Sequence, residues 1–404
     1  MTLPTFEEAR KIVLDHVAPL GAEQVPLLDA VGRVLAEDVA SPSDFPAWDN
    51  SAMDGYAVHA ADAHGGARLP LAAYLPAGSA GAGPLAPGTA AKILTGAPVP
   101  EGADAIVPFE EAEEKDGAVR ALAPVRAGAH VRRRAEDLRA GELALQAGTV
   151  IGPPQVSWLA TSSRLFVPVH RRPRVAILST GDELVPPGEP VGPGKIHDSN
   201  GVAVAAAVRQ AGGEPVLLGI ARDDREALRE RLAEALRADA VVTSAGVSMG
   251  DRDYVREVLA ALDVRQIFWK VDIKPGRPTA FALRGTTPVF SLPGNPVSTL
   301  LTFEQFVRPA LLRMQGRREV LRPTVRAVFQ EDLRRKPGRT HFLRVRLERR
   351  GDALLAWSAG NQDTGILKTM LRADGIAILP SDLGDLSSGT PVEVQILSPD
   401  LAPA

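Results

Sequence analysis

The chain has 404 residues, and at about 150 residues per domain this length predicts two to four domains. Hydrophobic residues make up 45% and charged residues 24% of the chain, which is a globular composition and excludes a disordered or fibrous protein. The formal net charge of -3 argues against a general binder of nucleic acid or anionic membranes, because such proteins carry a large positive excess.

Cysteine is absent and histidine occurs 7 times. The absence of cysteine excludes disulfides, thiolate metal sites, iron–sulfur clusters and a cysteine nucleophile. Any metal is therefore expected to be a hard cation held by carboxylates and substrate oxygens. The first residues do not resemble a targeting segment, and no apolar run reaches the roughly 18 residues of a membrane helix. We expect a cytoplasmic protein without a nucleic-acid or membrane partner.

The first part of the chain predicts one domain inserted into another. Residues 1–44 begin with a helical pattern in which Phe6, Ala9 and Val13 lie on one face. Residues 45–137 are rich in Gly, Pro and short β-prone runs, which predicts a β-rich unit with many turns. Mixed character returns over residues 138–172. We therefore predict a discontinuous first domain, 1–44 and 138–172, which flanks an inserted second domain.

Strands and helices alternate over residues 173–318. A buried apolar run begins at Val175, a helix is expected over residues 201–211, and Leu228 and Leu232 follow on the next helix. Strands joined by helices of about a dozen residues form a parallel sheet that is covered on both faces. Residues 319–404 hold short alternating runs and predict a small C-terminal β domain. The predicted fold class is multidomain α/β plus β, with a three-layer α/β parallel-sheet domain and two β-rich domains.

Three strands of the predicted parallel sheet end in polar loops, at residues 179–183, 222–224 and 244–253. Ligands of open α/β sheets bind outside the carboxyl ends of the strands. Each loop supplies a carboxylate to that edge, and the three are Glu183, Asp223 and Asp253. Together they can bind Mg²⁺ that bridges to a phosphate. The alternative for any single loop is an ordinary helix cap or turn.

Two further loops have the composition of anion sites. Residues 270–278 place Lys274 and Arg277 between rigid turn residues, and fixed cations suit an oxyanion, although a basic surface turn is the alternative. In residues 291–298, Asn295 is expected to be the N-cap of a helix that continues to Phe306. The start of that helix, with Ser298 one turn inside it, is a second candidate anion site.

Two segments upstream are also polar. Residues 49–58 place acids, an amide and a hydroxyl before a strand, where turn chemistry is the alternative explanation. Residues 132–137 have the sequence Arg-Arg-Arg-Ala-Glu-Asp. A basic run followed by acids usually marks a solvated face or local ion pairs.

These segments together resemble the molybdopterin molybdotransferase family, which includes the E domain of gephyrin. The matching motifs are DNSAMDGYA at residues 49–57, TGAPVP at 95–100, RRAED at 133–137, STGDEL at 179–184, GVS at 246–248, KPGRP at 274–278 and PGNPVS at 293–298. They occur in order over residues 49–298, and their combination is highly specific. The last hundred residues match less sharply, through GNQ at residues 360–362.

The resemblance implies a four-domain homodimer whose boundaries fall at 1–44 with 138–172, 45–137, 173–318 and 319–404. It implies an active site between the third domain of one subunit and the second domain of its partner. The implied reaction transfers molybdenum from molybdate to adenylylated molybdopterin, with Mg²⁺-dependent release of AMP. Implied partners are the molybdopterin adenylyltransferase that supplies the substrate and the maturation proteins of molybdoenzymes.

The family's functional residues carry over to named positions of this sequence. The catalytic candidates are Asp54, Thr95, Asp137, Glu183, Asp223 and Asp253, with Glu183 and Asp223 also as metal ligands. The substrate-binding candidates are Ser179, Thr180, Gly181, Ser248, Lys270, Lys274, Arg277, Pro293 and Ser298. We expect Asp54, Thr95 and Asp137 to act across the dimer.

The sequence departs from the family pattern at a few positions. Ala245 stands where Gly is common, and Arg277 stands where Lys is frequent. Thr364 occupies the place of an expected serine, and either Arg339 or Arg344 corresponds to the family's pocket arginine.

Two alternative functions remain open from the sequence. The first is molybdopterin adenylyltransferase, the preceding step on the same fold, which would need only the third domain, residues 173–318. The second is a non-catalytic, gephyrin-like scaffold. Molybdate and tungstate are not distinguished, because the two oxyanions have nearly the same size and charge.

Overall fold

The computed structural model describes residues 3–80, 83–222, 224–245 and 254–397. The chain divides into two compact units. The larger unit comprises Met1–Val25, Gly32–Ala36 and Val167–Ala404, and the smaller unit comprises Pro26–Val31 and Glu37–Phe166. The predicted division into four domains remains a proposal.

The smaller unit is built around a six-stranded sheet with the order β7-β4-β6-β5-β9-β8. Its strands are β4 (Gly55–Val58), β5 (Leu69–Leu75), β6 (Ala90–Ile93), β7 (Ala105–Pro108), β8 (Ala112–Lys115) and β9 (Ala118–Ala121). Both faces of the sheet are covered, because alternate residues of β4 enter different apolar clusters. Tyr56 and Val58 pack with Leu69 and Val107, whereas Ala57 packs with a second group.

Short elements complete the smaller unit. β3 (Asn50–Ser51) pairs with β10 (Val131–Arg132), and β2 (Val39–Ala40) pairs with β11 (Leu143–Leu145). One helix, α2 (Pro153–Thr161), begins with prolines at the positions that tolerate them. Many short strands joined by turns agree with the predicted β-rich texture of residues 45–137.

The larger unit contains a six-stranded sheet with the order β16-β13-β17-β21-β20-β18. Four strands are parallel, namely β13 (Arg174–Thr180), β16 (Glu214–Ala221), β17 (Ala240–Ser244) and β21 (Thr287–Leu292). β20 (Ala280–Arg284) is antiparallel to both of its neighbours, β21 and the edge strand β18 (Arg265–Phe268), which the sequence did not predict. The reason is the two-residue connection between β20 and β21, because only antiparallel strands can be joined by so short a turn.

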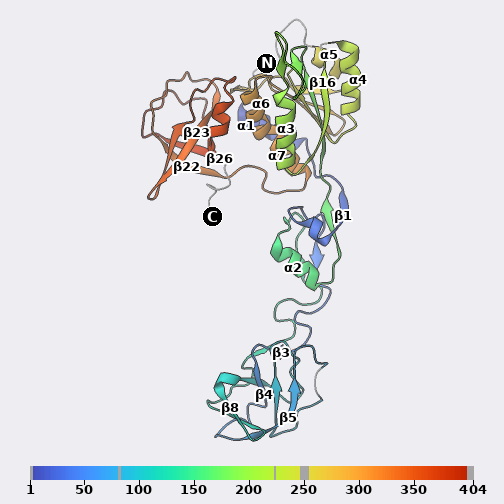
Figure 1. Cartoon of the computed structure of the whole chain (residues 1–404), viewed down its shortest axis with the longest axis vertical. Coiled ribbons are helices and arrows are strands. Elements are labelled where there is room, and N and C mark those ends of the chain that lie inside the picture. The colour runs from blue at the N-terminus through green and yellow to red at the C-terminus, as the bar shows by residue number, and fades with distance from the viewer. Residues whose placement is uncertain (1–2, 81–82, 223, 246–253, 398–404) are drawn as a thin grey trace. The chain divides into compact units, whose positions relative to one another are not determined.

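Helices cover both faces of this sheet (Figure 1). One face carries α1 (Phe6–Asp15), α3 (Ser199–Gln210), α6 (Pro296–Thr302) and α7 (Arg308–Met314), and the other carries α4 (Arg225–Ala235) and α5 (Tyr254–Ala261). A π-helical turn, Phe303–Val307, joins α6 to α7, so the helix predicted to continue to residue 306 extends to Met314. Phe6 of α1 is buried against Phe306 and Phe342. The three-layer α/β prediction is confirmed.

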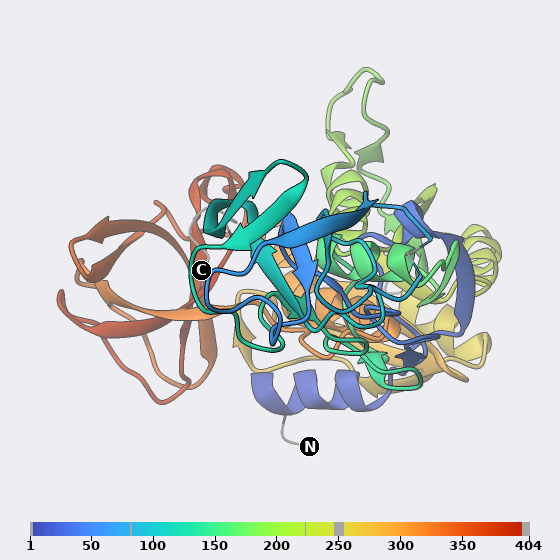
Figure 2. The ribbon, with the colours of Figure 1, turned by 90° about the horizontal axis from the view of Figure 1, so that it is seen from below.

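The C-terminal part of the larger unit is a closed five-stranded β-barrel. Its strands are β22 (Thr324–Phe329), β23 (Thr340–Arg350), β24 (Ala353–Ser358), β25 (Gly375–Leu379) and β26 (Pro391–Ile396), and a pairing of β23 with β25 closes the ring. Figure 2 shows these strands as a ring. Leu343 and Val345 of β23 pack inside the barrel, whereas Phe342 faces Phe6. β19 (Ile273–Lys274) pairs with the start of β23 and joins the barrel to the α/β part.

Candidate active site

The parallel strands end in register, so two of the three loops predicted at this edge, those after β13 and β17, begin beside the predicted anion-site loop after β21. Ser179 of β13 is paired with Ser244 of β17, and Ser244 is paired with Leu292 of β21. Thr180 donates a hydrogen bond to the Ser244 carbonyl at 3.4 Å. The loops that begin at Gly181, Ala245 and Pro293 are therefore adjacent, as the edge rule for open α/β sheets predicts.

Glu183 folds back over Gly181 at this edge. A Cβ added at Gly181 would lie 2.5 Å from Glu183 Oε2, and the φ of Gly181 is 142°. Only glycine allows both this backbone conformation and the close approach of the carboxylate. The Glu183 side chain is exposed and makes no hydrogen bond or ion pair with another residue that the structure describes. Its oxygens are available to a cation.

Three predicted residues lie outside the described part of the chain. They are Asp223, Ser248 and Asp253. Across the described ranges, no group of three or more His, Asp or Glu side chains is arranged to hold a metal ion.

The polar start of α3 is a feature of this edge that was not predicted from the sequence. Asp198, which is only 7% exposed, caps the helix by accepting a hydrogen bond from the Gly201 N–H at 2.9 Å. The Asn200 amide donates to the Gly294 carbonyl at 2.6 Å and so ties α3 to the loop after β21. The buried Ser179 hydroxyl lies beside them without a hydrogen-bond partner. The signal was present as an Asp-Ser-Asn-Gly run at a helix start.

Lys274 ends β19, and Arg277 lies on the loop that follows, whose backbone is fixed by its neighbours. Gly276 adopts φ 101°, and a Cβ there would lie 2.4 Å from the Thr302 Cγ2 atom of α6. The Lys274 and Arg277 side chains are exposed, and neither forms an ion pair within the described residues. Lys270 is half-buried earlier in the same segment. This geometry agrees with a rigid presentation of two cations.

Asn295 stands at the N-cap position of α6, but its side chain does not cap the helix. Its amide instead donates to the Thr364 hydroxyl at 2.8 Å, and the Val297 N–H donates to the Thr364 carbonyl at 3.3 Å. The predicted N-cap position is therefore confirmed, but the Asn295 side chain bonds to a partner far away in the sequence instead of capping the helix. These bonds join the loop of Pro293 and the buried Ser298 to the segment after β24.

Arg344 is the largest fully buried side chain of the structure's described part. Its Nε donates to Thr369 Oγ1 at 3.2 Å and its Nη2 donates to the Asp363 carbonyl at 3.3 Å, whereas Nη1 has no partner. Burial lowers the pKa of Arg344 to about 10, so it remains charged at neutral pH. Arg339 is partly exposed and pairs with Asp272 at 3.3 Å. Of the two alternatives, Arg344 is the one that lies beside the segment of Thr364.

In the smaller unit, Asp54 and Thr95 form a closed hydrogen-bond pair. Asp54 Oδ1 accepts from both the Thr95 N–H and the Thr95 hydroxyl, each at 2.7 Å. The backbone N–H of Thr95, followed by its hydroxyl, holds the pKa of Asp54 below its usual value. Asp54 is therefore ionised at neutral pH.

Asp137 lies in a second part of the smaller unit. It lines a cavity of about 510 Å³ together with Phe45, Asn50 and Arg132. Asp49 holds the neighbouring loop by accepting from Arg133 Nη1 and from the Arg134 N–H, both at 2.7 Å. Backbone hydrogen bonds connect the segments that carry Asp54, Thr95 and Asp137. β3, which contains Asn50, pairs with β10, and the Gly96 N–H donates to the Ser51 carbonyl at 2.8 Å.

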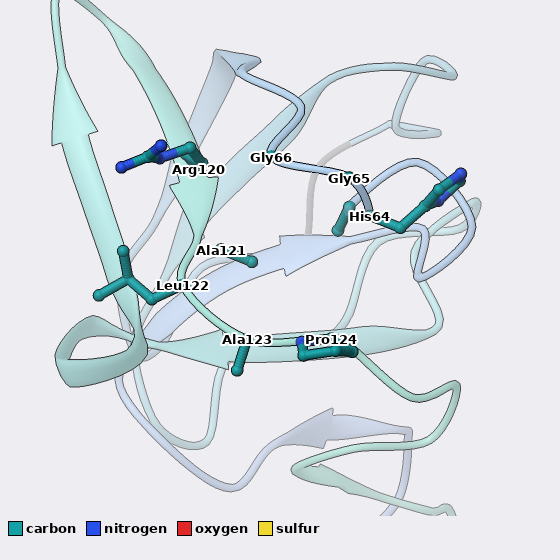
Figure 3. Close-up of a pocket in the computed structure, with 9 residues that line it drawn as sticks. His64, Gly65, Gly66, Arg120, Ala121, Leu122, Ala123 and Pro124 are labelled. Atoms are coloured by element: carbon teal, nitrogen blue, oxygen red, sulfur yellow. The ribbon is translucent and has the colours of Figure 1, made fainter.

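Another cavity of the smaller unit, of about 330 Å³, is lined by none of the predicted site residues. His64 and Arg120 line it, but Figure 3 shows these two side chains pointing away from one another. Arg120 forms an ion pair with Glu113 at 2.5 Å. This cavity does not present converging functional groups.

The described helices include none that is long and apolar enough to cross a membrane. Three family descriptions match successive parts of the chain: the MoeA N-terminal region (domain I and II) at residues 4–163, the probable molybdopterin binding domain at 176–313, and the MoeA C-terminal region (domain IV) at 326–397.

Similar proteins agree with these matches along nearly the whole chain. A molybdopterin molybdenumtransferase of Nostoc sp. is 38% identical, with 97% of this chain and 93% of the relative covered. Molybdopterin molybdenumtransferase 2 of Mycobacterium tuberculosis is 37% identical, with 96% and 98% covered. Two solved structures of molybdopterin biosynthesis MoeA proteins from Pyrococcus horikoshii have TM-scores of 0.86 and 0.82 at 34% and 31% identity, each covering 98% of this chain and 100% of the other. The chain therefore belongs to the molybdopterin molybdenumtransferase family.

Proposed function

We propose that this chain transfers molybdenum from molybdate to adenylylated molybdopterin and releases AMP. The observation that carries this function is similarity to curated molybdopterin molybdenumtransferases over 93% or more of their length. The chain is accordingly a transferase enzyme of molybdenum cofactor biosynthesis. An adenylyltransferase would need only the α/β part, and no observation favours that alternative or a scaffold.

The edge of the parallel sheet is the proposed site for the phosphate groups of the substrate. Glu183 offers two unpaired carboxylate oxygens there, and the Ser179 hydroxyl is buried without a partner. Mg²⁺ in proteins is commonly held by one or two carboxylates together with substrate phosphates, so this donor set fits it. We propose Glu183 and Asp223 as its ligands. When bound, Mg²⁺ would neutralise charge on the phosphate oxygens.

Asp54 is proposed to act electrostatically rather than as a proton acceptor. Its pKa is held low by two hydrogen bonds from Thr95, and a carboxylate with a lowered pKa is a weak general base. A carboxylate that stays ionised is well suited to orienting a cation or a water molecule. We propose that Asp54, Thr95 and Asp137 perform this task in the active site of the partner subunit.

The oxyanion is proposed to bind where Lys274, Arg277 and Arg344 supply positive charge. The unpartnered Nη1 of Arg344 is a buried donor that needs an acceptor. The Thr364 hydroxyl oxygen accepts from Asn295, which leaves the hydroxyl proton free to be donated to the oxyanion. Pro293 lies on the adjoining loop and Ser298 in the first turn of α6, and Lys270 adds charge to the segment of Lys274 and Arg277.

A homodimer is proposed for this chain, and an exposed apolar patch in the smaller unit supports it. The patch consists of Leu28 (76% exposed), Val31 (50%), Leu165 (75%) and Phe166 (59%). The residues belong to neighbouring segments, because the Leu27 N–H donates to the Leu165 carbonyl at 3.0 Å. Clustered exposed apolar side chains are typical of protein interfaces. We further propose a cytoplasmic location, with a molybdopterin adenylyltransferase and molybdoenzyme maturation proteins as partners.

Release of AMP from adenylylated molybdopterin, with and without molybdate at fixed Mg²⁺, tests the proposed function. Molybdate-dependent release is expected, and its absence from a folded protein would contradict the proposal. Glu183→Gln should abolish release, whereas Glu189→Gln, an exposed acid six residues away, should not. Adenylylation of molybdopterin with ATP would instead identify the preceding step of the pathway.

A further inference from the structure

A cavity of about 1000 Å³ opens at one end of the C-terminal barrel. The start of β23, the loop before it and the connection from β25 to β26 meet at this end, because β23 and β25 are antiparallel neighbours. On β23, His341 follows the same alternation as Leu343 and Val345, which pack inside the barrel, and His341 lines the cavity. The cavity is therefore the mouth of the barrel, a common place for ligands.

The barrel mouth is strongly cationic. Its lining includes five basic side chains, from Lys274, Arg334, Arg335, Lys336 and Arg339, and two carboxylates, from Asp272 and Asp385. These leave an excess of three positive charges. Both carboxylates are already engaged: Asp272 pairs with Arg339 at 3.3 Å, and Asp385 accepts from the Arg335 N–H at 2.7 Å. Lys274, Arg334 and Lys336 form no ion pair with other described residues.

The loop that carries these cations is fixed before any ligand arrives. Arg335 donates from Nη1 to the Pro380 carbonyl at 3.0 Å and from Nη2 to the Arg339 carbonyl at 2.9 Å. The Gly338 N–H donates to the Ser381 carbonyl at 2.7 Å. Because the backbone of the loop is already held in place, a ligand would lose less free energy to ordering of the loop.

His341 adds an uncharged polar group to the mouth. Burial, followed by the nearby charges of Lys274, Arg335 and Arg344, lowers the pKa of His341 to about 4. The imidazole is therefore neutral at physiological pH and offers one donor and one acceptor. Its presence lets the pocket recognise a ligand by hydrogen bonding as well as by charge.

We propose that the barrel mouth binds a phosphate ester, with Arg334 and Lys336 as its principal contacts. Arginine and lysine together are the usual recognition groups for phosphate, and the cavity is larger than a lone inorganic ion needs. The site goes beyond the proposed transfer reaction, which does not require Arg334 or Lys336. The phosphate belongs either to a free phosphate compound or to the pterin substrate, and the second case would move a substrate phosphate group from the proposed sheet-edge site to the barrel mouth.

Calorimetric titration of the full chain with inorganic pyrophosphate tests this site. The variant pair Arg334→Gln/Lys336→Gln should weaken pyrophosphate binding by about tenfold or more. The matched control is Arg346→Gln/Arg349→Gln, which removes the same charge from exposed positions towards the other end of β23 and should change binding less than about twofold. Equal effects of the two pairs, or no binding to the unmodified chain, would overturn the proposal.

A second measurement distinguishes the two sources of phosphate. If the pterin substrate supplies it, the Arg334→Gln/Lys336→Gln pair also raises KM for adenylylated molybdopterin. If a free phosphate compound supplies it, KM stays unchanged although pyrophosphate binding is lost. The pyrophosphate titration needs no turnover, so failure of the transferase assay would leave the test of this site intact.

Discussion

The two units treat their functional charges in opposite ways. In the smaller unit, Asp54 and Asp49 each accept two hydrogen bonds at 2.7 Å from neighbouring groups. In the larger unit, Glu183, Lys274 and the Nη1 atom of Arg344 have no partner among the described residues. A satisfied network fixes geometry, whereas unpaired groups keep their binding energy for a ligand. The carboxylates of the smaller unit are thus held in a fixed orientation, whereas the charged groups of the larger unit are available to bind a ligand.

Loss of a carboxylate from either unit should have the strongest effect. We expect Glu183→Ala and Asp54→Ala each to lower AMP release by about 10³-fold, because each removes a fixed charge from the reacting phosphate region. Both side chains are exposed or at a loop surface, so the melting temperature should stay close to that of the parent chain. An unfolded variant, or full activity, would contradict the assignment.

Rigidity of the cationic loop can be tested at Gly276. We expect Gly276→Ala to lower the free energy of unfolding by about 2–4 kcal/mol, because the new Cβ meets Thr302 and the φ of 101° disfavours alanine. Gly338→Ala is the control, since Gly338 has φ 116° but no atom within 4 Å of the new Cβ. Denaturant unfolding should show a smaller loss for the control. Equal losses would mean that the contact with α6 is not restrictive.

Loss of the unpaired Lys274 cation should raise the requirement for molybdate more than the requirement for adenylylated molybdopterin. Lys274→Ala is expected to raise the molybdate concentration needed for half-maximal activity by about tenfold, because a charge-assisted contact to the oxyanion is lost. The KM for adenylylated molybdopterin should change less. Equal changes in both, measured by initial rates, would refute the proposed oxyanion pocket.

Asn295 should show a weaker effect of the same kind. Asn295→Ala removes the hydrogen bond that orients the Thr364 hydroxyl, and we expect the molybdate requirement to rise about threefold to fivefold. Thr364→Val should have an effect at least as large. If Asn295 acts through Thr364, the double variant will be no worse than Thr364→Val alone; additive losses would indicate independent roles.

The smallest expected change concerns backbone strain in the two units. Ala245 of the larger unit and Ala135 of the smaller unit have φ values of 69° and 60°, in the region that favours glycine. We expect Ala245→Gly and Ala135→Gly each to raise the free energy of unfolding by about 0.5–1 kcal/mol. Lower stability of either variant in denaturant titrations would show that the alanine methyl group contributes packing that outweighs the strain.

Much of the larger unit was predictable because its signals are local. The apolar run from Val175 and the spacing of Leu228 and Leu232 predicted the strands and helices that the structure contains. Parallel strands then bring their carboxyl ends together without further information, so the positions of Ser179, Thr180 and Pro293 at one edge followed from topology.

Features that depend on distant partners were not predictable. Asn295 has the sequence signal of an N-cap, yet its amide bonds to Thr364, 69 residues away. Closure of the barrel depends on the pairing of β23 with β25, which no local pattern reveals. The cation excess at the barrel mouth likewise arises only when the loop of Arg334 meets Lys274 and His341 in space.

Closure of the C-terminal barrel has a consequence for how other proteins can recognise it. Each of its five strands already has a neighbour on both sides, so the ring leaves no strand with a whole edge open. An extended peptide therefore finds no complete edge for β-augmentation, the mode in which a strand is added to an open sheet edge. A protein that binds this part of the molecule must read its side chains, and the same closure protects the barrel from edge-to-edge aggregation.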